Sequence, residues 1–173
     1  MASIFTKIIK GEIPSYKIAE DEHYYAFLDI NPLQKGHTLV VPKQETDYIF
    51  DLSDEQLAGL IVFAKKVAEA IEKSIPCQRV GIAVLGLDVP HAHVHLVPLN
   101  GGDDLNFCNP KKQFSAEEMK RFEEAGKQIP MLYAANTSKL VNIMNKLLEL
   151  VTATLKDEID IEILEMHDQW KKD

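Results

Sequence analysis

The chain has 173 residues, of which 46% are apolar and 27% charged, the balance of a soluble globular protein with one ordinary domain and room for a small appendage. Its formal net charge of −8 disfavours a nucleic acid or an anionic membrane as the main partner. We expect no membrane-spanning segment, which would need about 20 consecutive apolar residues, and no signal peptide. Cys77 and Cys108 lack metal-ligand spacing, so reduced thiols in a cytoplasmic protein are expected.

The first part of the chain predicts a short helix, a hairpin and a third strand. Residues 4–9 begin as an amphipathic segment that a glycine and a proline soon end. Two strand-like runs, residues 16–20 and 24–28, flank a short polar turn and favour a hairpin. Residues 36–42 form a β-branched run between a glycine and a proline, which predicts a third strand.

The middle of the chain predicts one long helix and two further strands. Ser53 and Gln56 have the spacing of a capping box, and apolar residues follow at helical spacing until Pro76. Residues 79–86 and 91–99 have the composition of strands. Because no glycine-rich phosphate-binding motif accompanies this order, we predict an α+β fold with a five-stranded antiparallel sheet, one long helix and one or two short ones.

The last part of the chain predicts a short helix and then an appendage. Ser115 and Glu118 form a second capping box, which predicts a helix to about residue 124. Residues 127–173 have the pattern strand–helix–strand, with an amphipathic helix in the middle. We therefore divide the chain into a domain of residues 1–126 and an appended segment of residues 127–173.

Three histidines, His91, His93 and His95, stand at alternate positions in an apolar run. In a strand they would share one face, while the residues between them point into a core. Three interpretations remain open at this point. The rings could be exposed polar residues, or two of them could bind zinc with another ligand such as His37. They could also process phosphate, one imidazole attacking while its neighbours donate to the developing charge.

The run HAHVHLV resembles the signature of the histidine triad superfamily, in which three histidines alternate with apolar residues. Residues 4–43 resemble the N-terminal half of its nucleotide-binding branch, and the likeness extends over roughly residues 3–123. The resemblance implies that His93 is the nucleophile that attacks an α-phosphorus. It implies that His91 and His95 orient the nucleophile, contact the phosphate and assist proton transfer, and that His37 is a fourth active-site histidine.

The same resemblance implies a nucleotide site. Asp29 matches the carboxylate that accepts hydrogen bonds from the ribose hydroxyls, although a turn-forming role is the simpler alternative. The apolar slot for the base matches six residues, which could equally be plain core: Ile4, Phe5, Ile8, Phe27, Ile30 and Leu39.

Two departures from the family pattern bear on the substrate. Leu87 and Asp88 occupy positions where the family often has Gln followed by Ser, Thr or an acid. A leucine cannot hydrogen-bond a phosphate, whereas Asp88, which we include among the nucleotide-binding residues, could hold a histidine or a leaving amine. An expected Asn is also absent from the strand before the triad. The chain lacks the N-terminal CxxC pair through which some bacterial members bind structural zinc, so we expect no such site.

Residues 127–173 resemble part of the substrate-binding domain of 4-hydroxy-tetrahydrodipicolinate reductase, through AANTS, the helix after it and DIEILEMH. The nucleotide-binding half of that enzyme has no counterpart in the chain. Asp168 also replaces a second motif histidine after His167. We therefore predict no reductase activity.

Together these features predict a cytoplasmic hydrolase or transferase that cleaves the α-phosphate bond of nucleoside phosphoramidates or dinucleoside polyphosphates. The reaction would pass through a nucleotidyl-histidine intermediate without a cofactor or metal. The expected partners are a purine nucleotide and a second copy of the chain. The alternatives are a nucleotide-binding protein with little turnover and a metal-binding protein.

Overall fold

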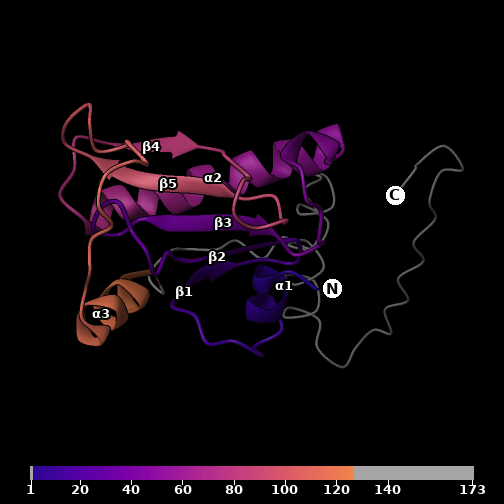
Figure 1. Cartoon of the computed structure of the whole chain (residues 1–173), viewed down its shortest axis with the longest axis horizontal. Coiled ribbons are helices and arrows are strands. Elements are labelled where there is room, and N and C mark those ends of the chain that lie inside the picture. The colour runs from indigo at the N-terminus through magenta and orange to yellow at the C-terminus, as the bar shows by residue number, and fades with distance from the viewer. Residues whose placement is uncertain (1, 127–173) are drawn as a thin grey trace, which may run out of the picture. The chain divides into compact units, whose positions relative to one another are not determined.

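A computed structural model describes residues 2–126 of the chain (Figure 1), and the predicted appendage of residues 127–173 lies outside the described residues. The elements are α1 (Ile4–Ile9), β1 (Lys17–Glu20), β2 (Tyr24–Leu28), β3 (Thr38–Pro42), the 3-10 helix η1 (Ile49–Asp51), α2 (Asp54–Ser74), β4 (Arg79–Ala83), β5 (Val94–Leu99) and α3 (Ala116–Gly126). Among the described residues, no helix combines the length and the apolar character needed to cross a membrane.

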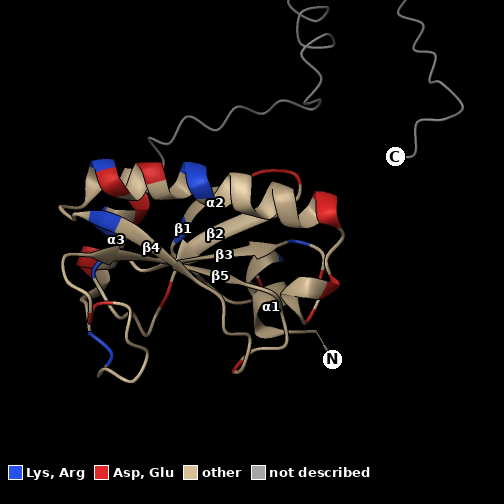
Figure 2. Cartoon of the chain, turned by 90° about the horizontal axis from the view of Figure 1, so that it is seen from above, with Lys and Arg blue, Asp and Glu red and all other residues tan. Residues whose placement is uncertain are grey.

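The five strands form one antiparallel sheet in the order β1-β2-β3-β5-β4. The predicted α+β fold, with its five-stranded antiparallel sheet, one long helix and two short ones, is therefore confirmed for this part of the chain. The long helix α2 connects β3 to β4 and crosses the sheet on one side, whereas α1 lies on the opposite side (Figure 2).

Alternating side chains give each face of the sheet its own apolar cluster. On the face covered by α2 and α3, Ala26, Val40 and Val94 belong to the main core together with the buried side of α2. On the other face, Phe27, Leu39 and Val41 pack with Phe5 of α1 in a smaller cluster. Because successive residues of a strand point to opposite faces, one apolar strand serves both clusters.

Both predicted capping boxes are present. The Ser53 Oγ accepts a hydrogen bond from the Gln56 backbone N–H at 3.2 Å, and the Gln56 side chain accepts one from the Ser53 N–H at 3.0 Å. The Glu118 side chain accepts a hydrogen bond from the Ser115 N–H in the same way. These reciprocal bonds satisfy backbone donors that a helix start leaves unpaired, and they define where α2 and α3 begin.

The strand predicted from residue 91 begins instead at Val94, where the ladder with Val40 of β3 starts. The segment before it bonds elsewhere, since the Ala92 N–H donates to the Thr46 carbonyl at 2.6 Å. Alternation nevertheless continues through this segment, because Ala92 belongs to the same core cluster as Val94 and Leu96. The prediction that the triad lies wholly within a strand was therefore wrong. The predicted end of the preceding strand, residue 86, was also too late, since β4 ends at Ala83.

Candidate active site

The sheet register brings the last triad histidine beside two residues of the predicted nucleotide slot. Phe27 of β2 pairs with Leu39 of β3, and Leu39 pairs in turn with His95 of β5. The three side chains therefore lie at one level across three neighbouring strands. His93 lies next along this face, with its ring centroid 4.9 Å from that of His95.

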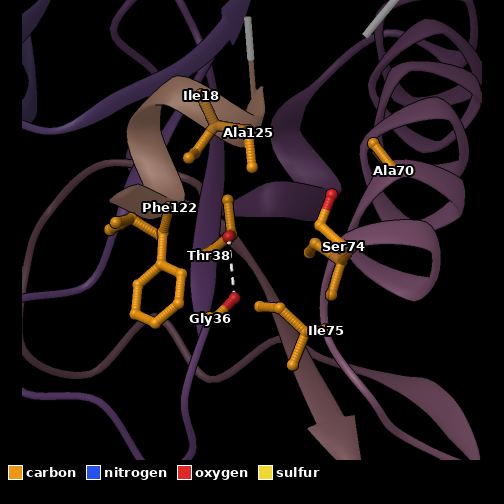
Figure 3. Close-up of a pocket in the computed structure, with 10 residues that line it drawn as sticks. Ile18, Gly36, Thr38, Ala70, Ser74, Ile75, Phe122 and Ala125 are labelled. Carbon is orange, nitrogen blue, oxygen red and sulfur yellow. Dashed lines mark hydrogen bonds between the residues drawn. The ribbon is translucent and has the colours of Figure 1, made fainter. Parts of the chain in front are cut away.

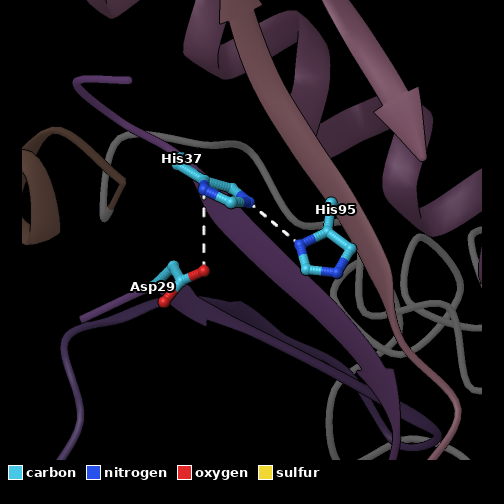
Figure 4. Close-up of side chains that lie close together, drawn as sticks. All are labelled: Asp29, His37 and His95. Atoms are coloured by element: carbon cyan, nitrogen blue, oxygen red, sulfur yellow. Dashed lines mark hydrogen bonds and ion pairs between the residues drawn. The ribbon is translucent and has the colours of Figure 1, made fainter. Parts of the chain in front are cut away.

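His37 and Asp29 lie at the connection between β2 and β3. The Asp29 backbone N–H donates to the His37 carbonyl at 3.0 Å. Gly36 precedes His37 with φ of 81°, a conformation that strongly favours glycine. The turn thus directs the buried ring of His37 toward His95, as Figure 4 shows.

A chain of hydrogen bonds fixes the tautomers of His37 and His95. The Leu33 backbone N–H donates to His37 Nδ1 at 3.1 Å, so in the neutral ring the proton is on Nε2. That Nε2–H donates to His95 Nδ1 at 3.0 Å. His95 therefore carries its own proton on Nε2, where it can donate to a phosphoryl oxygen.

The tautomer of His93 is the opposite one. His93 Nδ1 lies 2.7 Å from the backbone carbonyl of His91, and a carbonyl oxygen only accepts, so Nδ1 carries the proton. The lone pair of the neutral ring is then on Nε2. An imidazole in this state is a nucleophile whose attacking atom is already deprotonated.

His91 is fully buried, and both its ring nitrogens have partners in the fold. Its Nε2 donates to the Pro42 carbonyl at 2.8 Å, and its Nδ1 accepts from the Ser3 hydroxyl at 2.7 Å. The ring is thus bound to β3 on one side and to the start of α1 on the other. The arrangement suits His91 to holding its neighbours in place.

Burial keeps several of these rings neutral. Burial, together with a smaller effect of the positive charge of Lys111, lowers the pKa of His37 from 6.5 to about 3. Burial likewise lowers the pKa of His95 to about 3, with further contributions from His37 and His93. The pKa of His91 is also lowered, chiefly by burial. The hydrogen-bond directions given above for His37, His91 and His95 therefore apply at neutral pH.

Four of the six residues predicted to form the base slot lie in one cluster beside the triad. Phe5, Phe27 and Leu39 are buried there, and Ile8 packs against them. The ring of Phe5 lies edge-on to both His91 and His93, with centroids 5.8 and 5.3 Å apart. Ile4 and Ile30 are 47% and 75% exposed, so their place in a base slot stays a prediction.

The two predicted acidic residues lie in different settings. Asp29 is half-buried, its Oδ1 accepting from the Asn31 N–H at 2.8 Å and its Oδ2 lying 3.5 Å from His37 Nδ1. Its turn-forming role is therefore present, and one oxygen remains outside that turn. Asp88 is exposed in the segment before the triad, beside Leu87, which is 85% exposed.

The group of potential metal ligands in the structure differs from the one expected from the sequence, which combined His37 with two triad histidines. Within the described residues, ligand atoms of Asp29, His37 and His95 lie within 4.8 Å of one another (Figure 4). A divalent ion binding between the two rings would have to displace the proton that His37 Nε2 donates to His95 Nδ1. His91, one of the triad histidines in that alternative, already uses both ring nitrogens.

An apolar hollow lies on the other face of the sheet, between α2, α3 and the strands (Figure 3). Its lining includes Ile18, Ile71 and Phe122, and the hydroxyl of Thr38 there donates to the Gly36 carbonyl at 2.9 Å. This lining offers apolar contact and no titratable side chain, in contrast to the histidine face.

Several neighbours of the triad were not predicted. Tyr25 and Val41 belong to the apolar cluster, and their spacing of two residues from Phe27 and Leu39 was a usable signal. The ring of Phe107 lies 4.9 Å from that of His95, and no sequence pattern marks this loop residue. Ser3, Thr6 and Glu45 form hydrogen bonds beside His91, and of these only Ser3 was recognisable, as a residue suited to cap α1.

An α+β sheet that presents paired histidines of fixed tautomer beside an apolar cluster is the arrangement of a nucleotide-processing protein of the histidine triad type. A profile of the HIT domain matches residues 10–102. The chain belongs to the histidine triad (HIT) family.

Relatives and solved structures agree with this membership. An uncharacterized HIT-like protein of Methanocaldococcus jannaschii is 44% identical over 105 residues, which cover 58% of this chain and 81% of that protein. An adenosine 5′-monophosphoramidase of Schizosaccharomyces pombe is 40% identical over 127 residues, covering 72% and 95% of the two chains. The crystal structure of a Zn-bound histidine triad family protein from Mycobacterium smegmatis superposes with a TM-score of 0.64 at 32% identity, covering 74% of this chain and 95% of that one.

Proposed function

We propose that the chain is a nucleotidyl hydrolase or transferase that cleaves the α-phosphate bond of a nucleoside phosphoramidate, with dinucleoside polyphosphates as the second substrate class. The observation that carries the proposal is the hydrogen bond from His93 Nδ1 to the His91 carbonyl, because it leaves the Nε2 lone pair available for attack. The name of the yeast relative, an adenosine 5′-monophosphoramidase, favours the phosphoramidate.

The reaction has two steps. In the first, His93 Nε2 attacks the α-phosphorus and the P–N bond breaks. The departing nitrogen takes the bonding electrons and a proton from solvent. In the second, water attacks the phosphorus and loses a proton, and the electrons of the N–P bond return to the imidazole. The Nε2–H of His95 is suited to donate to the non-bridging oxygens in both steps.

The nucleoside would bind along the apolar cluster. Phe5 and Phe27 would contact the base, while Asp29 Oδ2 would accept a hydrogen bond from a ribose hydroxyl. His37 would act through His95, whose tautomer it sets. The exposed carboxylate of Asp88 would repel phosphate and attract a cationic leaving amine.

Trapping the intermediate tests the proposal. The purified chain is mixed with adenosine 5′-phosphoramidate, quenched within one turnover and analysed by mass spectrometry. We expect one AMP on His93 and steady release of AMP in the wild type. His93→Ala should abolish both, while His23→Ala, which changes an exposed histidine in a turn, should leave both unchanged.

Other outcomes favour the alternatives. Binding of AMP without adduct or turnover would indicate a nucleotide-binding protein, in line with the replacement of polar family residues by Leu87 and Asp88. Stoichiometric zinc that survives dialysis and is lost in His37→Ala would instead favour a metal-binding protein at the group in Figure 4.

We further propose that the chain acts in the cytoplasm, in line with its free cysteines Cys77 and Cys108, and that it forms a homodimer, as its resemblance implies. The edge strand β4 pairs with β5 on one side, and Ile82 in this strand is exposed, as are Val84 and Leu85 directly after it. An apolar edge strand is suited to pairing with a second copy. Sedimentation velocity tests the proposed homodimer. A mass equal to that of a single chain at micromolar concentration would contradict it.

A further inference from the structure

A group of hydrogen bonds joins the start of α1 to the segment after β3 and to His91. The Oε2 atom of Glu45 accepts from the Ser3 backbone N–H at 2.9 Å and from the Thr6 hydroxyl. The Thr6 backbone N–H donates to Ser3 Oγ at 3.0 Å, and Ser3 Oγ lies 2.7 Å from His91 Nδ1. We name the three residues Ser3, Thr6 and Glu45 the Glu45 clamp.

The direction of each bond in the clamp follows from the available protons. The Thr6 hydroxyl proton goes to the Glu45 carboxylate, which only accepts, and these bonds lower the pKa of Glu45 and keep it ionised. Because His91 Nε2 donates to the Pro42 carbonyl, Nδ1 of the neutral ring is an acceptor. Ser3 Oγ also lies 3.1 Å from Thr6 Oγ1, but its contact with His91 Nδ1 is shorter at 2.7 Å, so we assign the single hydroxyl proton of Ser3 to His91 Nδ1.

The clamp reaches the nucleophile through the backbone of His91. With its ring held by Ser3 and Pro42, the carbonyl of His91 has a fixed place, and this carbonyl accepts the Nδ1–H of His93. Phe5 of α1 packs edge-on against both rings, so the helix that the clamp anchors also limits their rotation.

We propose that Glu45 is a positioning residue for the His93 nucleophile. Through Ser3 and Thr6 it holds the ring of His91, and so it keeps the proton of His93 on Nδ1 and the lone pair on Nε2. The kinetic part of this inference rests on the proposed function, whereas the tautomer part does not. Glu45 itself is exposed and touches neither reacting ring, so its effect is indirect.

A carboxylate near a helix start can also act on stability alone, by accepting unpaired backbone N–H groups. Such a role predicts that Glu45→Ala lowers the melting temperature and leaves the histidine tautomers and the rate of the chemical step unchanged. The positioning role predicts that both change. Ring nitrogen chemical shifts of His91 and His93, measured by NMR on the full chain, therefore separate the two roles.

The test compares Glu45→Ala with Glu45→Gln, which retains an acceptor oxygen for Ser3 and Thr6. In the wild type we expect His91 protonated on Nε2 and His93 on Nδ1. In Glu45→Ala the His93 signals should shift toward a mixture of tautomers, and the single-turnover rate of AMP transfer should fall on the order of tenfold. Glu45→Gln should keep the wild-type tautomers and a rate within about twofold of the wild type.

Two controls locate the effect. Glu69→Ala removes an exposed carboxylate of α2, which lies on the opposite face of the sheet, and should change neither readout. Thr6→Val removes the hydroxyl donor, and when it is combined with Glu45→Ala the rate should fall no further than in Glu45→Ala alone, because the bond between Thr6 and Glu45 is already lost in Glu45→Ala.

Wild-type tautomer signals and a wild-type single-turnover rate in Glu45→Ala would overturn the inference, even if stability fell. If the wild type forms no AMP adduct, the proposed function fails, and the tautomer comparison alone then decides whether the clamp positions His93.

Discussion

At the scale of single residues, the two carboxylate oxygens of Asp29 face different partners. Oδ1 accepts the Asn31 backbone N–H at 2.8 Å and closes a turn, while Oδ2 lies 3.5 Å from His37 Nδ1. His37 is neutral at physiological pH because burial lowers its pKa to about 3. The contact is therefore no ion pair, and Oδ2 retains acceptor capacity for a hydroxyl donor.

The variant Asp29→Asn tests that capacity. Its amide oxygen would still accept the Asn31 N–H, so we expect the melting temperature to change little. The variant would lose the negative charge that strengthens hydrogen bonds from ribose hydroxyls, so KM for adenosine 5′-phosphoramidate should rise about tenfold, with kcat much less affected. The matched substrate is the 2′,3′-dideoxy analogue, for which wild type and Asp29→Asn should have similar KM. An equal rise for both substrates would contradict a ribose contact.

Sequence patterns predict only part of how these side chains are arranged and protonated. Strand alternation correctly places the three triad histidines on the face opposite Ala92 and Val94. The tautomers do not follow from it, because they depend on the carbonyls of His91 and Pro42 and on the Leu33 N–H, which any residue type would supply. Glu45 carries no local signal either, since its partner Thr6 is 39 positions away.

At the scale of elements, the turn into β3 depends on Gly36. Its φ of 81° is unfavourable for other residues, and an added Cβ would lie 2.0 Å from Ile75 Cδ1, just beyond α2. His37 follows directly, so the same turn that lies against Ile75 also places the ring of His37 beside that of His95. Gly36 therefore affects both the packing at the end of α2 and the position of His37.

Gly36→Ala should accordingly destabilise the protein in two ways. The left-handed backbone conformation costs about 1 kcal/mol for a residue with a Cβ, and crowding against Ile75 costs about 1–3 kcal/mol more. Gly11→Ala is the matched control, because Gly11 has φ of 75° with nothing within 4 Å of the added Cβ. Urea unfolding should show a larger loss for Gly36→Ala. Equal losses for the two variants would show that the Ile75 contact relaxes freely.

Element boundaries were predictable where the signal is local. Both capping boxes could be identified because Ser53 and Ser115 bond to residues three positions on. The start of β5 could not, because it depends on where the ladder with Val40 ends and on the bond from Ala92 to Thr46, a residue distant in sequence. The apolar run of residues 91–99 continues unbroken through that point.

At the scale of the whole molecule, folding encloses several histidine rings in neutral form. Their burial allows specific hydrogen bonds in place of water, yet it removes each ring from the solvent that would stabilise its charged form. The fold as a whole must supply the stability that this burial opposes, which in the described residues comes from the main core between the sheet and α2. The free energy of unfolding should therefore depend on pH even at values well above the pKa range of carboxylates.

The direction of that dependence follows from His37 and His95, whose pKa values burial lowers from 6.5 to about 3. Between these two values the unfolded chain binds more protons than the folded one, so the unfolding free energy decreases as pH falls. From pH 7.5 to 5.5 the two rings together should lower it by at most about 3 kcal/mol. Urea unfolding across this interval measures the loss, and in His95→Asn the loss should be smaller by about half, because one of the two rings is gone. Identical pH slopes in wild type and variant would mean that His95 has the same pKa in the folded and the unfolded chain. The assignment of His95 as a neutral ring that donates from Nε2 would then be contradicted.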